Sequence, residues 1–119
     1  MRRICKLALL VMALWPVEAN AHADEGRGFH VLGLGNNSCG AWTTERAQRT
    51  TTALAMTSWI QGFITAYNFD VPGPSDLTKG TDVDGIQAWM DNYCAQHPLA
   101  NIADAAIALV DELSKRAAP

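Results

Sequence analysis

The longest stretch of helical periodicity lies in the middle of the chain. Its apolar positions are separated alternately by three residues and one, and they are Met56, Trp59, Ile60, Phe63, Ile64 and Tyr67. This spacing places all six side chains on one face of an α-helix. Several Pro and Gly residues follow, so we expect the helix to end before a loop over residues 68–82.

Two further apolar stripes with the same period follow this loop. The first consists of Val83, Ile86, Trp89, Met90, Tyr93 and Cys94. The second consists of Ile102, Ala105, Ala106, Leu109, Val110 and Leu113. Asp82 is predicted to cap the first of these helices. His97 is predicted to end it, because Pro98 disfavours the α conformation in the preceding residue. The last helix is expected to run from about Ala100 to Arg116.

A shorter helix is predicted upstream, from about Gly40 to Ala47, because Ser38 and its neighbours have helix-capping side chains. Three consecutive threonines at positions 50–52 predict a break or a cap after it. Residues 24–37 contain four glycines and are expected to form a flexible or extended arm, ordered only where it packs on the helices. The pattern predicts an all-α domain over residues 38–119: a small bundle of three main helices plus a short one.

The first 23 residues follow a different pattern. A basic start is followed by nine uncharged residues, Leu7 to Trp15, and by small-x-small sites that end at Ala21 and Ala23. This is the order of a secretory signal peptide, and the apolar run is far shorter than the roughly 20 residues that cross a membrane. We expect residues 1–23 to be a signal peptide cleaved after Ala21 or Ala23. The mature protein would then be periplasmic or secreted, without a membrane span. A helix packed in the core is the alternative for this segment.

Cleavage would leave two cysteines, Cys39 and Cys94. In an oxidising compartment an even pair of cysteines predicts a disulfide. Two buried free thiols are the alternative. In the chain-entropy model, a bond across this much chain stabilises the fold by about 4 kcal/mol. We expect it to pin the short helix to the helix that follows the loop.

Composition and charge restrict the partners. The chain has 119 residues, enough for one domain, and 49% of them are hydrophobic, enough for a core. The net charge is −3, which excludes a nucleic-acid binder that relies on a basic face. The expected mature chain has six Lys and Arg against eleven Asp and Glu, a net charge of −5.

Residue patterns for catalysis or metal binding are weak. His30 and His97 belong to no CxxC or HExxH spacing. An EF-hand loop starting at Asp76 lacks the glutamate required at its twelfth position. A two-carboxylate site has only Glu45 with Asp91 as a candidate pair. We therefore expect no enzyme activity, no cofactor and no metal.

The aromatic residues are the candidate binding positions. They lie mostly at helical core spacing, so most are expected to pack in the core. Any that are exposed would mark a surface for client proteins or a dedicated protein partner. The six candidates are Trp42, Trp59, Phe63, Tyr67, Trp89 and Tyr93.

One arrangement of residues extends over most of the expected mature chain. It consists of Ser38-Cys39 at a helix start, Trp59 in the central helix, Asp84 to Ile86 opening the next helix, Asn92 to Pro98 closing it, and Asn101-Ile102 leading into the last. This layout resembles the HdeA/HdeB family of small periplasmic acid-stress chaperones. The resemblance implies an all-helical fold with one disulfide, a homodimer at neutral pH, and release of client-binding apolar surface in acid.

The charge balance is compatible with activation by acid. At about pH 2 the carboxylates are protonated, and the mature chain would change from −5 to about +9. Such self-repulsion loosens a compact state. We expect a non-enzymatic exported protein that binds unfolded client proteins under acid stress. The chain also resembles the small helical, disulfide-bonded periplasmic immunity proteins that neutralise type VI secretion toxins, which implies one dedicated partner as the alternative.

Overall fold

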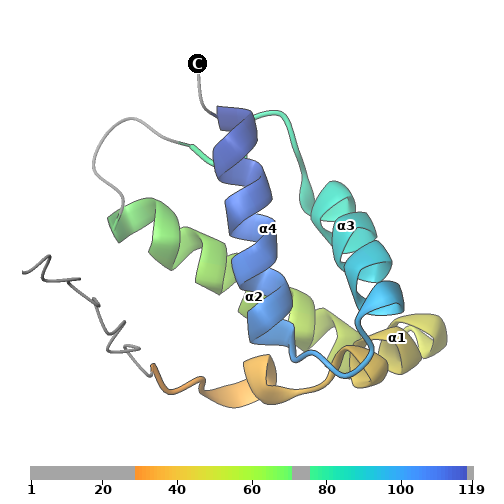
Figure 1. The fold of residues 1–119 in the computed structure, drawn as a ribbon. Helices are drawn as coiled ribbons and strands as arrows, with labels where there is room; N and C mark the ends of the chain where they lie inside the picture. Colours follow the sequence, from red (N-terminus) through yellow and green to blue (C-terminus); the bar gives the residue numbers. More distant parts are fainter. Residues whose placement is uncertain (1–28, 71–75, 118–119) are drawn as a thin grey trace, which may run out of the picture.

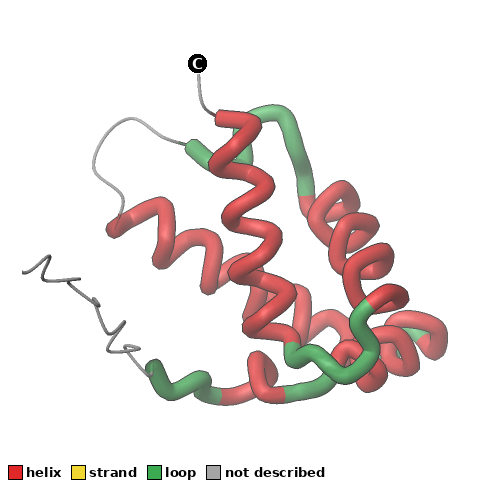
Figure 2. Tube along the Cα trace, viewed as in Figure 1, coloured by secondary structure: helices red, strands yellow, loops and turns green. Residues whose placement is uncertain are grey.

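A computed structural model describes residues 29–70 and 76–117. Within these ranges the chain forms one short 3-10 helix and four α-helices and no strand (Figures 1 and 2). They are η1 (Gly33–Asn36), α1 (Cys39–Gln48), α2 (Thr51–Asp70), α3 (Val83–Gln96) and α4 (Ile102–Ala117). The all-α prediction, with three main helices and a short one, is confirmed. The predicted signal peptide, residues 1–23, lies outside the described residues, as do positions 24–28 of the predicted arm.

The helix α4 lies at the centre of the arrangement. It packs against α2 on one side and α3 on the other, and α1 packs against α3 and α2 near the amino-terminal end of α4 (Figure 1). All six positions of the stripe predicted for the last helix are buried. The burial of these side chains against two neighbours is the main stabilising contribution that α4 can make.

Side-chain caps define where the helices begin. The Ser38 hydroxyl accepts a hydrogen bond from the Ala41 amide (3.1 Å), and the Asp82 carboxylate accepts one from the Gly85 amide (2.8 Å). Both caps agree with the sequence prediction. Capping by Asn101, which accepts from the Asp104 amide at 2.8 Å, was not predicted. It sets the start of α4 at Ile102 rather than near Ala100.

The break between α1 and α2 is sharper than predicted. Arg49 adopts a left-handed conformation (φ 53°), which ends α1. The Thr50 hydroxyl then accepts a hydrogen bond from the Ala53 amide (3.1 Å), as a helix cap does. Thr51 and Thr52 are helical, so the predicted break is confined to positions 49 and 50. β-Branched residues are tolerated there because no preceding helical turn crowds their side chains.

The predicted loop over residues 68–82 begins too early, because α2 continues to Asp70. Proline restricts the residue before it, and the first proline of this segment is Pro72, so the helix can extend almost to that point. Asn68 has a role in the returning chain, since its side-chain oxygen accepts a hydrogen bond from the Leu77 amide (3.3 Å). This contact anchors the part of the connection that precedes α3.

The predicted arm has an ordered part. Residues 29–32 have no regular secondary structure, and η1 follows them and packs against both α2 and α4. Gly33 has a positive φ of 68°, a conformation that other residues adopt only with strain. Gly35 is buried. The arm is therefore part of the packed structure from η1 onward.

Candidate functional site

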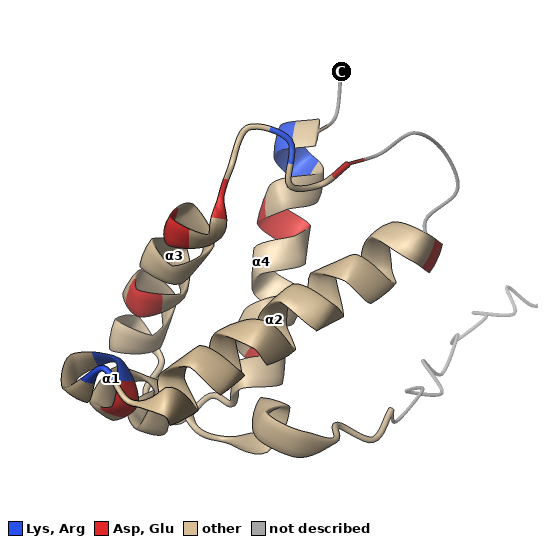
Figure 3. Cartoon of the chain, turned by 180° about the vertical axis from the view of Figure 1, so that it is seen from behind, with Lys and Arg blue, Asp and Glu red and all other residues tan. Residues whose placement is uncertain are grey.

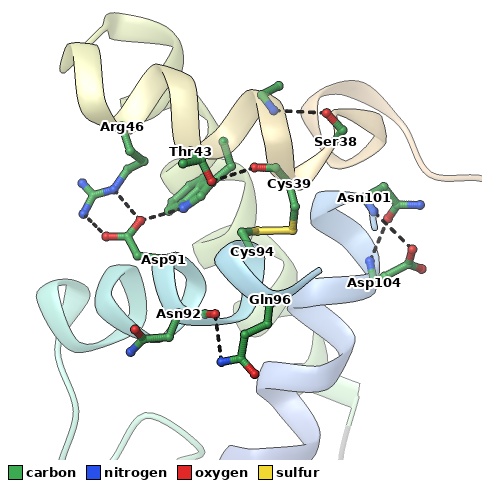
Figure 4. Close-up of a disulfide and its surroundings, with 12 residues drawn as sticks. Ser38, Cys39, Thr43, Arg46, Asp91, Asn92, Cys94, Gln96, Asn101 and Asp104 are labelled. Atoms are coloured by element: carbon green, nitrogen blue, oxygen red, sulfur yellow. Dashed lines mark hydrogen bonds and ion pairs between the residues drawn. A yellow bond between two sulfur atoms is a disulfide. The ribbon is translucent and has the colours of Figure 1, made fainter. Parts of the chain in front are cut away.

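The predicted disulfide between Cys39 and Cys94 is present. The sulfur atoms are 2.10 Å apart and the two Cα atoms 4.7 Å apart. Cys39 is the first residue of α1, Cys94 lies in the last turn of α3, and both side chains are buried (Figure 4). The bond excludes two free thiols and joins α1 to α3, as predicted. It also occupies the only cysteines of the described residues, so neither sulfur is available as a nucleophile.

One turn before Cys94, the carboxylate of Asp91 accepts three hydrogen bonds from α1 (Figure 4). Two come from Arg46, with Nε 3.1 Å from Oδ1 and Nη2 2.8 Å from Oδ2. The third comes from the indole nitrogen of Trp42, 2.7 Å from Oδ1. We call Trp42, Arg46 and Asp91 the Asp91 clamp. Bidentate pairing of arginine with a carboxylate is among the strongest polar geometries in proteins.

The electrostatics of the clamp favour a charged Asp91. The hydrogen bond from Arg46 is the largest effect, and it lowers the pKa of Asp91 below its ordinary value of 3.8. Burial raises this pKa by less than that hydrogen bond lowers it, and the Trp42 hydrogen bond and the Arg46 charge lower it further. The same hydrogen bond raises the pKa of Arg46. The side chains are 29% and 41% exposed, so water screens the pair, and we expect it to contribute about 1 kcal/mol.

Within residues 29–70 and 76–117, the Arg46–Asp91 pair of the clamp is the one ion pair that connects two helices. The other two pairs in these ranges, Lys115 with Asp111 and Arg116 with Glu112, connect residues four positions apart within α4. Charges are also sparse on α2, where Asp70 at the carboxyl end is the one acidic or basic residue (Figure 3). Among the charge pairs described, the Asp91 clamp is therefore the one whose loss would loosen contact between helices.

A chain of hydrogen bonds extends the clamp to α2. Arg46 Nη1 donates to the side-chain oxygen of Gln87 (3.2 Å), and the Gln87 amide nitrogen donates to the Thr57 hydroxyl (3.1 Å). The Thr57 hydroxyl donates in turn to the carbonyl of Ala53 (2.9 Å). The three helices α1, α3 and α2 are thus connected by one polar network, and removing a member affects the others.

Replacing Asp91 with Asn is expected to reduce the acid sensitivity of the fold. Because the pKa of Asp91 is lowered in the folded state, its contribution is present above the unfolded value near 4 and is lost as the pH falls through the lower folded value. We expect D91N to lower the free energy of unfolding by about 1 kcal/mol at neutral pH. Between neutral pH and about pH 3, the free energy of unfolding should fall by less in D91N than in the wild type. Urea denaturation at the two pH values measures this.

The matched control is Asp111→Asn, which makes the same chemical change within the ion pair internal to α4. This pair lies within one helix, so the free energy of unfolding of D111N should fall between neutral and acid pH by as much as that of the wild type. Equal acid losses in D91N and the wild type would contradict the role assigned to the clamp.

The six aromatic candidates lie in different environments. Trp42 is fully buried, so in the folded protein this predicted binding position is not accessible to a partner. The physical reason is that α1 turns this side chain toward α3, where its indole nitrogen reaches Asp91. Trp59, Phe63, Trp89 and Tyr93 are partly buried against the core, and Tyr67 is 40% exposed. Trp59 stacks on Phe63 (centroids 5.6 Å apart), and Trp89 stacks on Tyr93 (5.3 Å).

Several exposed apolar side chains were not among the predicted binding positions. The most exposed are Leu99 (98%), Phe69 (93%), Leu32 (78%) and Leu54 (65%). Leu54 and Phe69 fall outside the apolar stripe of α2, and this mismatch is the sequence signal that identifies them. Only a contiguous group of such side chains would mark a contact surface for other proteins, because exposed apolar residues scattered singly are common.

The carboxylates considered for catalysis serve separate structural contacts. Glu45 accepts a hydrogen bond from the Thr50 hydroxyl, whereas Asp91 is held by Arg46 and Trp42. Asp76 accepts hydrogen bonds from the amide and the hydroxyl of Thr78, as in a turn. In the part of the chain that the structure describes, no three His, Cys, Asp or Glu side chains converge as a metal site.

Comparison of the chain with family models, with curated proteins and with solved structures gives no match. The described helices include none with the length and apolar character needed to span a membrane. Functional interpretation therefore depends on the disulfide, the Asp91 clamp and the exposed apolar positions.

Proposed function

We propose that this protein is an exported, non-enzymatic stress-protection protein that binds unfolded client proteins in acid. The observation that carries the proposal is the composition of the α1–α3 contact. An acid-stable disulfide and an acid-sensitive carboxylate clamp lie there one helical turn apart. The first limits how far the helices can separate, and the second weakens their contact as the pH falls.

Acid acts on the clamp through Asp91. Protonation removes the negative charge that Arg46 and Trp42 share, so their hydrogen bonds weaken. The pair alone contributes too little to unfold a domain. The additional driving force is the change of the mature chain from −5 to about +9, which adds repulsion throughout the molecule.

Loosening at this contact would uncover apolar surface. Trp42 and Met90 are fully buried on facing helices, and the core continues from them to Ile60 and Ile102. With α1 and α3 still joined at Cys39 and Cys94, the chain cannot expand fully in acid. The same bond favours a return to the folded state after neutralisation, because it reduces the entropy of the unfolded chain.

Export is part of the proposal. A disulfide of two buried cysteines persists in oxidising compartments such as the periplasm and is rare in the cytosol. The pattern of residues 1–23 supports a cleaved signal peptide. The predicted homodimer at neutral pH belongs to the same hypothesis, and sizing across pH measures it.

The test follows light scattering of an aggregation-prone client enzyme at about pH 2–3 with and without the mature protein. We expect slower aggregation with the oxidised wild-type protein than with an equal mass of a control protein. Protein reduced beforehand should protect the client enzyme less on return to neutral pH, because the disulfide that joins α1 to α3 is absent.

Aggregation as fast as with the control protein would overturn the proposal. Recovery of a single stoichiometric partner in a pull-down at neutral pH, without protection in acid, would instead support the immunity-protein alternative. The two functions differ in partner and condition: many unfolded clients in acid in the first case, and one dedicated partner at neutral pH in the second.

A further inference from the structure

Leu32, Gly33 and Gly35 lie against the Trp59 side chain, and we call the segment that contains them, residues 29–36, the strap. The Trp59 indole nitrogen donates a hydrogen bond to the carbonyl of Leu32 (2.8 Å). Gly35 lies against the six-membered ring of the same indole: a Cβ at this position would be 2.3 Å from Trp59 Cζ2. The Asn36 side chain donates to the carbonyl of Val31 (2.7 Å) and closes the strap on itself. Trp59 is therefore covered by main chain and by a glycine.

A groove of about 220 Å³ lies between α2 and α4. Its lining, which defines the α2–α4 groove, is Phe63, Tyr67, Ile107, Val110, Asp111 and Ser114. Tyr67 is 40% exposed and Ile107 41%, so apolar surface is open to solvent there. Phe63 stacks on Trp59 with centroids 5.6 Å apart, so one lining residue of the groove touches the tryptophan that the strap covers.

The chemistry of this surface favours a neutral or basic apolar ligand. The helix α2 carries no charged residue between Thr51 and Phe69, and Figure 3 shows it in the tan of uncharged residues except at the carboxyl end. The one charged side chain of the groove is Asp111, which Lys115 pairs from the same helix. An acidic ligand would be repelled by Asp111 and by the negative net charge of the chain.

We propose that the α2–α4 groove and Trp59 together bind a short apolar peptide segment of a client protein, and that the strap occupies the Trp59 end as an intramolecular competitor. The strap identifies the ligand class by its own contacts: a main-chain carbonyl on the indole N–H, a glycine against the ring, and Leu34 packed on the core. The inference deepens the proposed function by assigning a site to client binding in the folded protein.

The variant that tests this is Gly35→Ala. Its new methyl group would meet Trp59 at 2.3 and 2.6 Å and Val31 at 2.6 Å, so the strap and the indole cannot keep their present contact. Gly62→Ala is the matched control, because a Cβ at Gly62, on the exposed side of α2, has nothing within 4 Å. Both variants make the same chemical change, and only the first displaces the strap.

The probe is a fluorescently labelled peptide with the sequence of residues 29–37, titrated at neutral pH and followed by anisotropy. We expect it to bind Gly35→Ala at least about tenfold more tightly than wild type, since displacement removes a competitor held at high effective concentration. Gly62→Ala should bind as wild type does. Equal affinity for all three proteins, or no binding to Gly35→Ala with its helix content intact, overturns the proposal.

A second variant keeps the test decisive if Gly35→Ala does not fold. Asn36→Ala removes the hydrogen bond that closes the strap and leaves Trp59 untouched. It should tighten peptide binding about threefold, the value of one exposed hydrogen bond. An unchanged affinity in Asn36→Ala, with Gly35→Ala unfolded, overturns the strap as competitor.

The groove itself is tested in the displaced-strap background. Adding Ile107→Gln to Gly35→Ala should weaken peptide binding about fivefold, because a partly buried aliphatic contact is lost. Leu54→Gln is the control, since Leu54 is an exposed leucine of α2 that does not line the groove. No effect of Ile107→Gln excludes the groove, and a dimer that Ile107→Gln dissociates assigns it to a second copy instead. These measurements are made on the folded protein, so their failure is distinct from failure of acid protection.

Discussion

The double variant Cys39→Ala, Cys94→Ala is expected to lose about 4 kcal/mol of unfolding free energy, the stabilisation that a loop of this length provides in the chain-entropy model. Both side chains are buried, so alanine keeps the site apolar, and the loss reflects mainly the unconstrained unfolded chain. Small domains have about 5–15 kcal/mol of stability in total. Urea denaturation at neutral pH, followed by far-ultraviolet circular dichroism, measures the change.

The control for this prediction is chemical reduction. Reduced wild-type protein should denature near the midpoint of the double variant, and the reductant should leave the variant unchanged. A double variant within about 1 kcal/mol of the oxidised wild type would show that the packing of α1 on α3 is sufficient without the bond. The disulfide would then do little to hold α1 and α3 together in acid, and the proposed function would lose its physical basis.

Trp42→Ala is expected to have a comparable effect through packing. Trp42 is fully buried between α1 and α3, and truncation of a buried tryptophan costs about 3–5 kcal/mol in lost transfer energy and cavity formation. The change also removes the hydrogen bond that the Trp42 indole N–H donates to Asp91. Urea denaturation gives the stability loss, and near-ultraviolet circular dichroism reports the packing of the remaining aromatic residues.

Two variants separate packing from hydrogen bonding in this result. Trp42→Phe keeps most of the ring and removes the donor, so its loss should be smaller than that of Trp42→Ala. Leu54→Ala truncates a side chain that is 65% exposed, and it should change stability by no more than about 0.5 kcal/mol. Similar losses in Leu54→Ala and Trp42→Ala would contradict the assignment of Trp42 to the core.

The helices were predictable where the local signal is strong. The stripe of α4 is buried throughout, and Asp82 caps α3 as its position implied. Periodicity and capping act within a few residues, so the chain sequence contains them directly. The prediction was least accurate at the end of α2, where Asn68 is helical and is held by an amide nine residues away.

The candidate site was only partly predictable. The two cysteines were identified by their number, because a pair of cysteines in an oxidising compartment has few alternatives to a disulfide. The contact partner of Asp91 was not predicted: Glu45 and Asp91 were paired only as candidate catalytic carboxylates, whereas the neighbouring Arg46 makes the contact. Adjacent positions on a helix point about 100° apart, so the rotation of α1 against α3 decides which of the two side chains faces Asp91.

The sequence by itself determined the all-α class, the positions of most helix ends and the pair of cysteines, because these depend on local periodicity and on counting. Only the tertiary structure decided that Trp42 is buried while Tyr67 remains accessible, and that the strap covers Trp59. Trp42 lies on a mostly polar helix and Trp59 on the longest apolar stripe, so the local pattern alone would favour burial of Trp59. Their environments differ because burial depends on which helix packs on each face, a property of the whole assembly of side chains.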